Sequence, residues 1–249
     1  MTKFAASLAG HQGFETMALQ EESHTEAYFG HLGRARELSQ RAEDNAKREG
    51  DGATAANIHA AAAVLEARFG NLTVARQLAA AAPLSGDAGM AAALAGDTDL
   101  ATKMVERLAS HSPAGGFFSK VWLPQVRAAI ESKQGNLRRA VELLEPAAVY
   151  EAGWSERYAS AYLRGQVYLD AHRGQEAVAE FQKVLDHRGV VLNSVIGALS
   201  HLQVGRAYAM SGDIAKARVA YQDFLTLWKD ADPDIPILKQ AKAEYAKLQ

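Results

Sequence analysis

Apolar residues recur along this chain every three or four positions, which is the spacing of one face of an α-helix. In the stretches from Arg34 to Arg48 and from Thr54 to Phe69, the regularly spaced apolar positions are Ala35, Leu38, Ala42, Ala46, Ile58, Ala61, Leu65 and Phe69. Alanine makes up about a fifth of the residues, whereas β-branched and aromatic residues are sparse. Because alanine favours helix while β-branched and aromatic residues favour strand, the pattern predicts an all-α fold.

Short turns of similar amino-acid sequence separate the predicted helices. Five of them place a glycine five residues before an alanine, in the pairs Gly30/Ala35, Gly70/Ala75, Gly96/Ala101, Gly135/Ala140 and Gly212/Ala217. Glycine adopts the left-handed conformation that ends a helix, and the Asn or Asp that follows it in most of these turns is suited to capping the next helix. A further turn at 171–174 differs, because its glycine, Gly174, lies two positions later. The turns predict a succession of antiparallel helix pairs.

The segment from Tyr158 to Trp228 contains one pattern of small and aromatic residues twice. Four positions recur at relative offsets 0, 3, 12 and 16, first as Gly165, Tyr168, Ala177 and Phe181, then as Gly205, Tyr208, Ala217 and Tyr221. This pattern resembles the tetratricopeptide repeat (TPR), a pair of antiparallel helices that stacks on copies of itself. We expect the glycine to face the small alanine where the two helices cross, and the aromatic residues to fill the space beside the crossing.

The resemblance implies a right-handed TPR-type solenoid, an α–α superhelix, with about six helix pairs and a C-terminal capping helix. The predicted units of this single solenoid at 13–249 are 13–50, 51–83, 84–112, 115–150, 155–189 and 193–230, with a disordered leader at 1–12 and the capping helix at 232–249. Asp234 is expected to cap that last helix and Pro236 to lie in its first turn. In the fourth unit, Pro124 implies that the first helix either begins at Leu123 or is kinked.

The amino-acid sequence of the C-terminal half also resembles that of a narrower group of proteins. Residues 143–153, 162–194 and 205–248 are similar to the C-terminal TPR region of large bacterial serine/threonine protein kinases and of related winged-helix regulators. The kinase motifs are absent from this chain: no Gly-rich phosphate loop occurs, and neither His187-Arg188 nor Asp223-Phe224 continues as a catalytic motif would. The resemblance implies a non-catalytic protein-interaction module. The alternative is the regulatory or sensor region of a split or truncated kinase or transcription regulator, whose activity lies on another polypeptide.

Charge and composition exclude several classes of protein. The formal net charge is −2, with 27 basic and 29 acidic residues scattered along the chain, so a basic stripe for nucleic acid is absent. There is no cysteine, and therefore no disulfide or thiolate site. Neither a signal-peptide core nor an apolar run of about 18 residues occurs, so we expect no membrane span. We expect a cytoplasmic protein, or an extracytoplasmic one if the chain is the sensor part of a membrane kinase.

Motifs for metal binding and catalysis are absent as well. The eight histidines form no His-x3-His pair and no H-E-x-x-H arrangement, and neither a G-x-S-x-G elbow nor a phosphate loop occurs. Close carboxylates such as Glu142 and Glu145 have a simpler interpretation as one charged face of a helix. The sequence therefore predicts no enzymatic activity, no cofactor and no metal.

The first helices of successive units are expected to line a concave groove that binds a protein or peptide. In the resembled family, relative positions 2, 5, 9, 12 and 13 of a repeat face this groove, counted with the repeat glycine as position 8. The resemblance then implies ten groove residues: Trp122, Gln125, Lys133, Tyr162, Gln166, Asp170, Leu199, Leu202, Arg206 and Met210. Their mixture of aromatic, apolar, amide and charged side chains suits a partner segment with polar contacts around an apolar anchor.

The repeat register leads to a first prediction, on stability. Replacing Ala177 or Ala217 by leucine is expected to overpack the crossing of two helices and to lower the free energy of unfolding by roughly 1 to 3 kcal/mol. The measurement is the thermal midpoint of each variant beside the wild type. An unchanged midpoint for either variant would contradict this assignment of helix faces.

Overall fold

Helix is the dominant structure of this protein. The computed structural model describes residues 13–111, 116–153 and 157–249, and within these ranges every regular element is helical and none is a strand. The prediction of an all-α fold is therefore confirmed. The predicted leader at 1–12 and the boundaries placed at 112, 115 and 155 lie outside the described residues.

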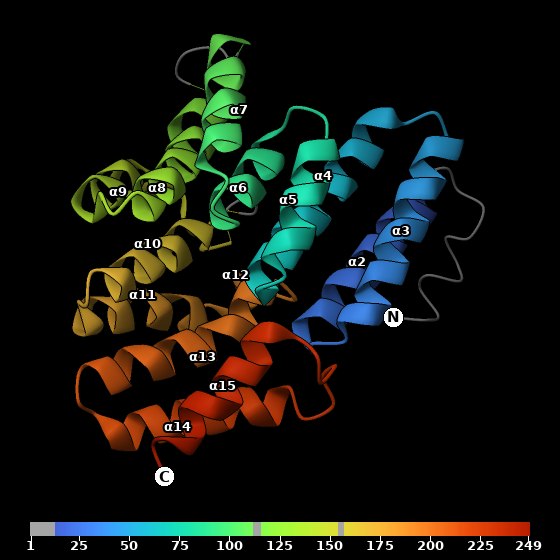
Figure 1. Ribbon diagram of the computed structural model, residues 1–249. Helices are drawn as coiled ribbons and strands as arrows, with labels where there is room; N and C mark the ends of the chain where they lie inside the picture. The colour runs from blue at the N-terminus through green and yellow to red at the C-terminus, as the bar shows by residue number, and fades with distance from the viewer. Residues whose placement is uncertain (1–12, 112–115, 154–156) are drawn as a thin grey trace.

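The helices follow one another as pairs, each pair within one of the predicted units (Figure 1). In chain order the pairs are α2 (Phe14–Tyr28) with α3 (Leu32–Arg48), α4 (Gly52–Phe69) with α5 (Leu72–Ala81), α6 (Gly86–Leu94) with α7 (Thr98–His111), α8 (Leu123–Lys133) with α9 (Leu137–Leu144), α10 (Ala159–Asp170) with α11 (Gly174–Asp186), and α13 (Val195–Met210) with α14 (Ile214–Leu227). Three short helices join them: the π-helix η1 (Phe118–Trp122), the 3-10 helix η2 (Glu145–Tyr150) and α12 (Arg188–Val191). The chain ends with α15 (Pro236–Ala246).

The turn glycines adopt the predicted conformation. All five, from Gly30 to Gly212, have φ between 80° and 88°. In the turn at 171–174 that conformation belongs to His172, with φ 56°, which also lies five residues before its alanine, Ala177. Gly174 has a different role, since a Cβ there would lie 2.8 Å from the carbonyl oxygen of Ala207. The displaced glycine therefore allows α11 to approach α13 closely.

The residue after the turn glycine caps the next helix only where it is an aspartate. Asp97 and Asp213 accept hydrogen bonds from the backbone N–H of Leu100 and Lys216, three residues further on. Asn71 and Asn136 make no such bond. Their amide groups instead donate to Glu66 and Glu131 at 2.8 Å, five residues earlier. The capping prediction is wrong for the two asparagines, because a nearby carboxylate accepts from their side chains.

The two repeat glycines have equivalent surroundings. A Cβ at Gly165 would lie 2.8 Å from the ring of Phe181, and one at Gly205 would lie 3.0 Å from the ring of Tyr221. The second aromatic residue of the pattern, rather than the alanine, therefore covers each glycine most closely, although Ala177 and Ala217 are fully buried. Tyr168 and Tyr208 also correspond, because each ring lies under a cation from the start of the following helix, Arg173 and Lys216 respectively.

The two prolines singled out in the sequence lie at helix starts. The chain passes through the π-helix η1 into α8, which begins at Leu123 with Pro124 in its first turn. Pro236 begins α15 as predicted, whereas Asp234 makes no capping bond and Ile235 occupies the N-cap position. One face of α15 is buried, with Ile237, Leu238 and Ala241 at most 7% exposed.

The end of the chain packs against its beginning. Trp228, which follows α14 and is 1% exposed, donates a hydrogen bond from Nε1 to the carbonyl oxygen of Tyr28 at 2.9 Å. Its ring centre lies 5.1 Å from that of Phe69 and 4.8 Å from that of Phe224. One hydrophobic cluster consequently joins α2, α3 and α4 to the helices from α10 to α15, and Figure 1 shows the red C-terminal helix close to the blue N-terminal pair.

Polar contacts around Asp232 reinforce this closing contact. The backbone N–H of Asp232 donates to the carbonyl oxygen of Gly30 at 3.0 Å, and its carboxylate accepts from the N–H of Gly33 at 2.7 Å. Asp232 thus caps α3, a helix 199 residues away in sequence. The segment between α14 and α15 fixes the last helix pair against the first one.

A second prediction concerns the closing contact. Trp228→Ala removes a buried indole and its hydrogen bond, so we expect the free energy of unfolding to fall by about 3 to 5 kcal/mol. Urea unfolding followed by circular dichroism measures the change. Val219→Ala, on the same helix pair at a side chain that is 57% exposed, serves as the control and should stay within about 0.5 kcal/mol of the wild type. Equal unfolding midpoints for the two variants would contradict the importance of this contact.

Candidate functional site

Five of the ten predicted groove residues meet in one depression. Lys133 lies at the end of α8, Gln166 and Asp170 in the last turns of α10, and Arg206 and Met210 in the last turns of α13. They line a depression of about 480 Å3 that we call the carboxyl-end groove. Its remaining lining comes from the ends of the same helices, from Leu94 of α6, and from Gln240 and Glu244 of α15. First helices of successive pairs therefore form its walls.

The polar residues of this groove differ in how strongly they are engaged by the protein itself. Arg206 donates two hydrogen bonds to Glu244, at 2.8 and 3.0 Å, and Glu244 also accepts from the hydroxyl of Tyr221. Among the described residues, Asp170 accepts a single hydrogen bond, from Ser132 at 3.0 Å. Lys133 is exposed and has no hydrogen bond or ion pair with any residue in the described ranges. Lys133 and Asp170 are the charged groups most accessible to a partner.

Arg206 fixes the last helix rather than presenting its charge. Burial alone would lower the pKa of its guanidinium, but the hydrogen bonds and charge of Glu244 outweigh burial and raise the pKa. Burial raises the pKa of the Tyr221 hydroxyl, and its hydrogen bond to Glu244 raises that pKa further. Arg206 therefore stays charged and holds α15 against α13.

Three of the other predicted residues belong to the core. Tyr162 is 2% exposed, and Leu199 and Leu202 are fully buried. The groove assignment is wrong for them, because helices from both ends of the chain cover the surface that an open stack would leave free. The last two, Trp122 and Gln125, line a different cavity near the start of α8.

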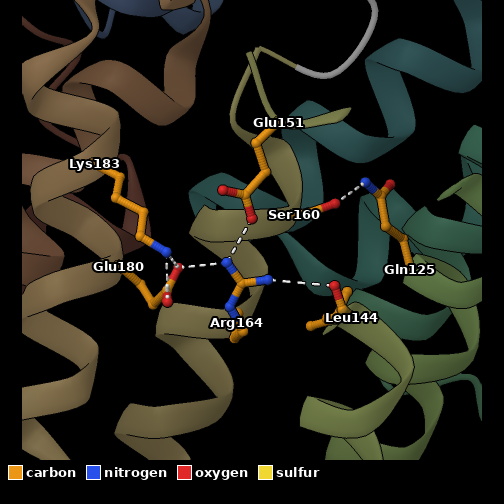
Figure 2. A network of polar contacts seen from close by, with 7 residues as sticks. All are labelled: Gln125, Leu144, Glu151, Ser160, Arg164, Glu180 and Lys183. Carbon is orange, nitrogen blue, oxygen red and sulfur yellow. Dashed lines mark hydrogen bonds and ion pairs between the residues drawn. The ribbon is translucent and has the colours of Figure 1, made fainter. Parts of the chain in front are cut away.

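A buried ionic network holds α10, the helix that contributes most to the groove (Figure 2). Arg164, 5% exposed, donates to Glu151 at 2.5 Å, to Glu180 of α11 at 2.7 Å and to the carbonyl oxygen of Leu144 at 3.3 Å. Lys183 supplies a second cation to Glu180. One guanidinium thus ties α10 to α11, to the end of α9 and to the loop that follows η2.

The network is electrostatically balanced despite its burial. Burial disfavours the charge of Arg164, but the hydrogen bonds from its guanidinium to Glu180 and Glu151 outweigh this effect and raise the pKa of Arg164. A separate buried pair, in which Gln125 donates to the hydroxyl of Ser160 at 2.8 Å, joins α8 to α10. These contacts fix the helices on which Lys133, Gln166 and Asp170 lie, so the groove is preformed.

The described residues offer little for other kinds of site. Across 13–111, 116–153 and 157–249, no group of three or more histidine or acidic side chains could hold a metal ion. In the same ranges no helix combines the length and the apolar character needed to cross a bilayer. What the groove provides is a set of fixed hydrogen-bonding and charged groups beside apolar side chains.

Sequence reasoning missed the contribution of the capping helix to the groove. Gln240 and Glu244 of α15 line it. The carboxylate of Glu244 accepts a hydrogen bond from Arg206, which is the one arginine among the ten predicted groove residues. The sequence contained a signal for this, since both residues lie on the polar side of the amphipathic pattern of α15. That pattern identifies the exposed side of α15 but cannot show that this side faces Arg206.

Comparison with known proteins does not assign this chain to a family. A scan against protein-family models gives no match, and a search of the curated proteins gives none either. The resemblance to tetratricopeptide repeats and to kinase-linked repeat regions therefore stays a prediction from the sequence.

A third prediction tests the network around Arg164. Arg164→Leu leaves Glu151 and Glu180 buried without their main cation, so the free energy of unfolding should fall by about 3 to 5 kcal/mol. The control is Arg139→Leu, which removes an exposed ion pair with Glu142 and should cost no more than about 1 kcal/mol. Chemical denaturation of both variants measures the difference. A loss of similar size in the two variants would contradict a special role for the buried network.

Proposed function

We propose that this chain is a non-catalytic protein-interaction module of the tetratricopeptide type, a right-handed stack of helix pairs. It holds an extended segment of a partner protein in the carboxyl-end groove. The observation that carries the proposal is the convergence of Lys133, Gln166, Asp170, Arg206 and Met210 on one groove. Repeat register alone selects these residues, and they come from three successive helix pairs.

The chemistry of the groove favours a peptide segment with an apolar side chain and an acidic neighbour. Met210 is 40% exposed and lies in the same lining as Leu94 and Leu169, which gives the apolar side chain a surface. Lys133 is the accessible cation, whereas Arg206 is neutralised by Glu244. Gln166 and Gln240 offer amide groups to the main chain of an extended segment, which gives affinity without a strict sequence requirement.

Preorganisation of the groove supports the binding of an extended segment. Its walls are fixed by Arg164, by the Gln125–Ser160 pair and by the Arg206–Glu244 pair, so little side-chain entropy is lost when a segment binds. The accessible groups, an ammonium, a carboxylate and two amides, are those of a recognition surface. The similarity of the sequence to kinase-linked repeats suggests a signalling protein as the source of the segment.

A fourth prediction follows for peptide binding. Random dodecapeptides displayed on phage are selected on the full chain, and the enriched sequences are synthesised with a fluorescent label. We expect these peptides to contain an apolar residue near an acidic one, and Lys133→Glu to weaken their binding by roughly tenfold or more, as measured by fluorescence anisotropy.

The matched control is Lys229→Glu, a charge reversal at an exposed lysine after α14 that lies outside the groove lining. It should leave the dissociation constant within about twofold of the wild-type value. Met210→Ala tests the apolar contact in the same assay and should also weaken binding. Enriched peptides that bind all three variants as tightly as the wild type would overturn the groove as the site.

A further inference from the structure

A second hollow lies among the first helices, close to the start of α8. It consists of two adjoining lobes of about 400 and 220 Å3, which we together call the arginine cavity. The residues lining both lobes are His24, Val64, Arg68, Asp87, Arg157 and Ser194. They come from α2, α4, α6 and the segments just before α10 and α13. No residue that the structure describes lines both the arginine cavity and the carboxyl-end groove.

Arg68 is the most unusual group in this cavity. Its guanidinium carbon lies 5.9 Å from the ring centre of Tyr162, and within the described ranges it forms neither a hydrogen bond nor an ion pair. Enclosure by the protein lowers the pKa of Arg68, although Tyr162 and Asp87 oppose this effect. Arg68 is half-buried and lines both lobes, so its guanidinium is open to a ligand in the cavity.

Asp87 presents the opposite charge to the same cavity. It lies in the first turn of α6, and among the described residues it has no hydrogen bond or ion pair. Burial raises the pKa of its carboxyl group, and the charge of Arg68 acts in the other direction. The two groups are therefore close enough to influence each other, yet they form no ion pair. Two half-buried charges of opposite sign line one cavity without forming an ion pair with each other.

An aromatic wall completes the cavity. A Cβ at Gly86 would lie 2.5 Å from the indole of Trp122, so the ring packs directly on the backbone of α6, next to Asp87. Met90 and Val126 extend this wall as an apolar surface. Trp122 is thus held in a fixed position, where a planar or apolar group in the cavity would contact it.

We propose that the arginine cavity binds a small zwitterion of the α-amino-acid class, with its carboxylate on Arg68, its ammonium on Asp87 and its side chain against Trp122. A zwitterion satisfies both unpaired charges at once. A simple anion could pair with Arg68, and Arg157 also lines both lobes, but it would leave the carboxylate of Asp87 without a counterion; a simple cation would leave Arg68 without one. The larger lobe has ample room for a single amino acid, because ligand pockets of this kind begin at about 300 Å3.

The test begins with the twenty common L-amino acids, each added separately at millimolar concentration to the full chain. Differential scanning fluorimetry identifies those that raise the thermal midpoint, and isothermal titration calorimetry measures their dissociation constants. For a positive result such as L-phenylalanine, 3-phenylpropionate lacks the ammonium group and 2-phenylethylamine lacks the carboxylate. We expect each of these analogues to bind at least tenfold more weakly than the amino acid.

Variants at the two charged positions locate the site. Arg68→Met and Asp87→Asn should each weaken binding of the same amino acid at least tenfold. The controls Arg127→Met and Asp99→Asn change exposed residues outside the cavity and should leave binding unchanged. Without ligand, the circular dichroism spectrum and the thermal midpoint of Arg68→Met are measured beside the wild type; a native helical spectrum with a cooperative transition separates loss of binding from misfolding.

Three results would each overturn the proposal. The first is that none of the twenty amino acids changes the midpoint of the wild-type chain. The second is that the deaminated analogue binds as tightly as the amino acid, which would indicate a site for simple anions. The third is that Arg68→Met keeps full affinity. Peptide binding at the carboxyl-end groove is measured independently, since Lys133 does not line the arginine cavity.

Discussion

The contact of Trp228 with Tyr28 and Phe69 determines whether the first helices of this protein form an open surface or a set of enclosed hollows. In a stack of helix pairs, each pair needs to contact only its neighbours, and the first helices then form an open surface. Here a single indole joins the end of the last pair to the first and second pairs, across about 200 positions of sequence. The first helices are therefore enclosed from both ends of the chain, and their surface is divided into hollows with walls on several sides.

Glycine makes the closing contact possible at two turns. Gly30 and Gly70 end α2 and α4 in the left-handed conformation, and both also lie against the C-terminal segment. A Cβ at Gly30 would lie 2.5 Å from that of Ala231, and one at Gly70 would lie 3.1 Å from Pro236. The other turn glycines of the same wording, such as Gly96 and Gly135, have open space at that position. All five turn glycines therefore provide the left-handed conformation. Among them, Gly30 and Gly70 also let the C-terminal segment pack closely against the turn.

This difference shows how much of the fold the sequence could predict. Helix periodicity, turn glycines and the offsets around Gly165 and Gly205 are local, and from them the helix pairs and the burial of Ala177 and Ala217 could be predicted. The exchange of glycine for His172 in one turn was missed, because a single left-handed residue of another type leaves no local signal. Closure was missed as well, since it depends on the summed geometry of six helix pairs rather than on any one of them.

The candidate site was predictable to the same extent and for the same reason. Of the ten residues that repeat register selects, five line the carboxyl-end groove, Lys133, Gln166 and Asp170 among them. Repeat register gives no information about how deeply a side chain is buried. Tyr162, for example, is a predicted groove residue but is only 2% exposed. This tyrosine contacts Arg68 of the arginine cavity through its ring, and its hydroxyl accepts from Gln203, which lines the groove, at 3.4 Å. A buried ring thus lies between the two hollows, which share no lining residue among those described, so the inner side has separate hollows instead of one continuous channel.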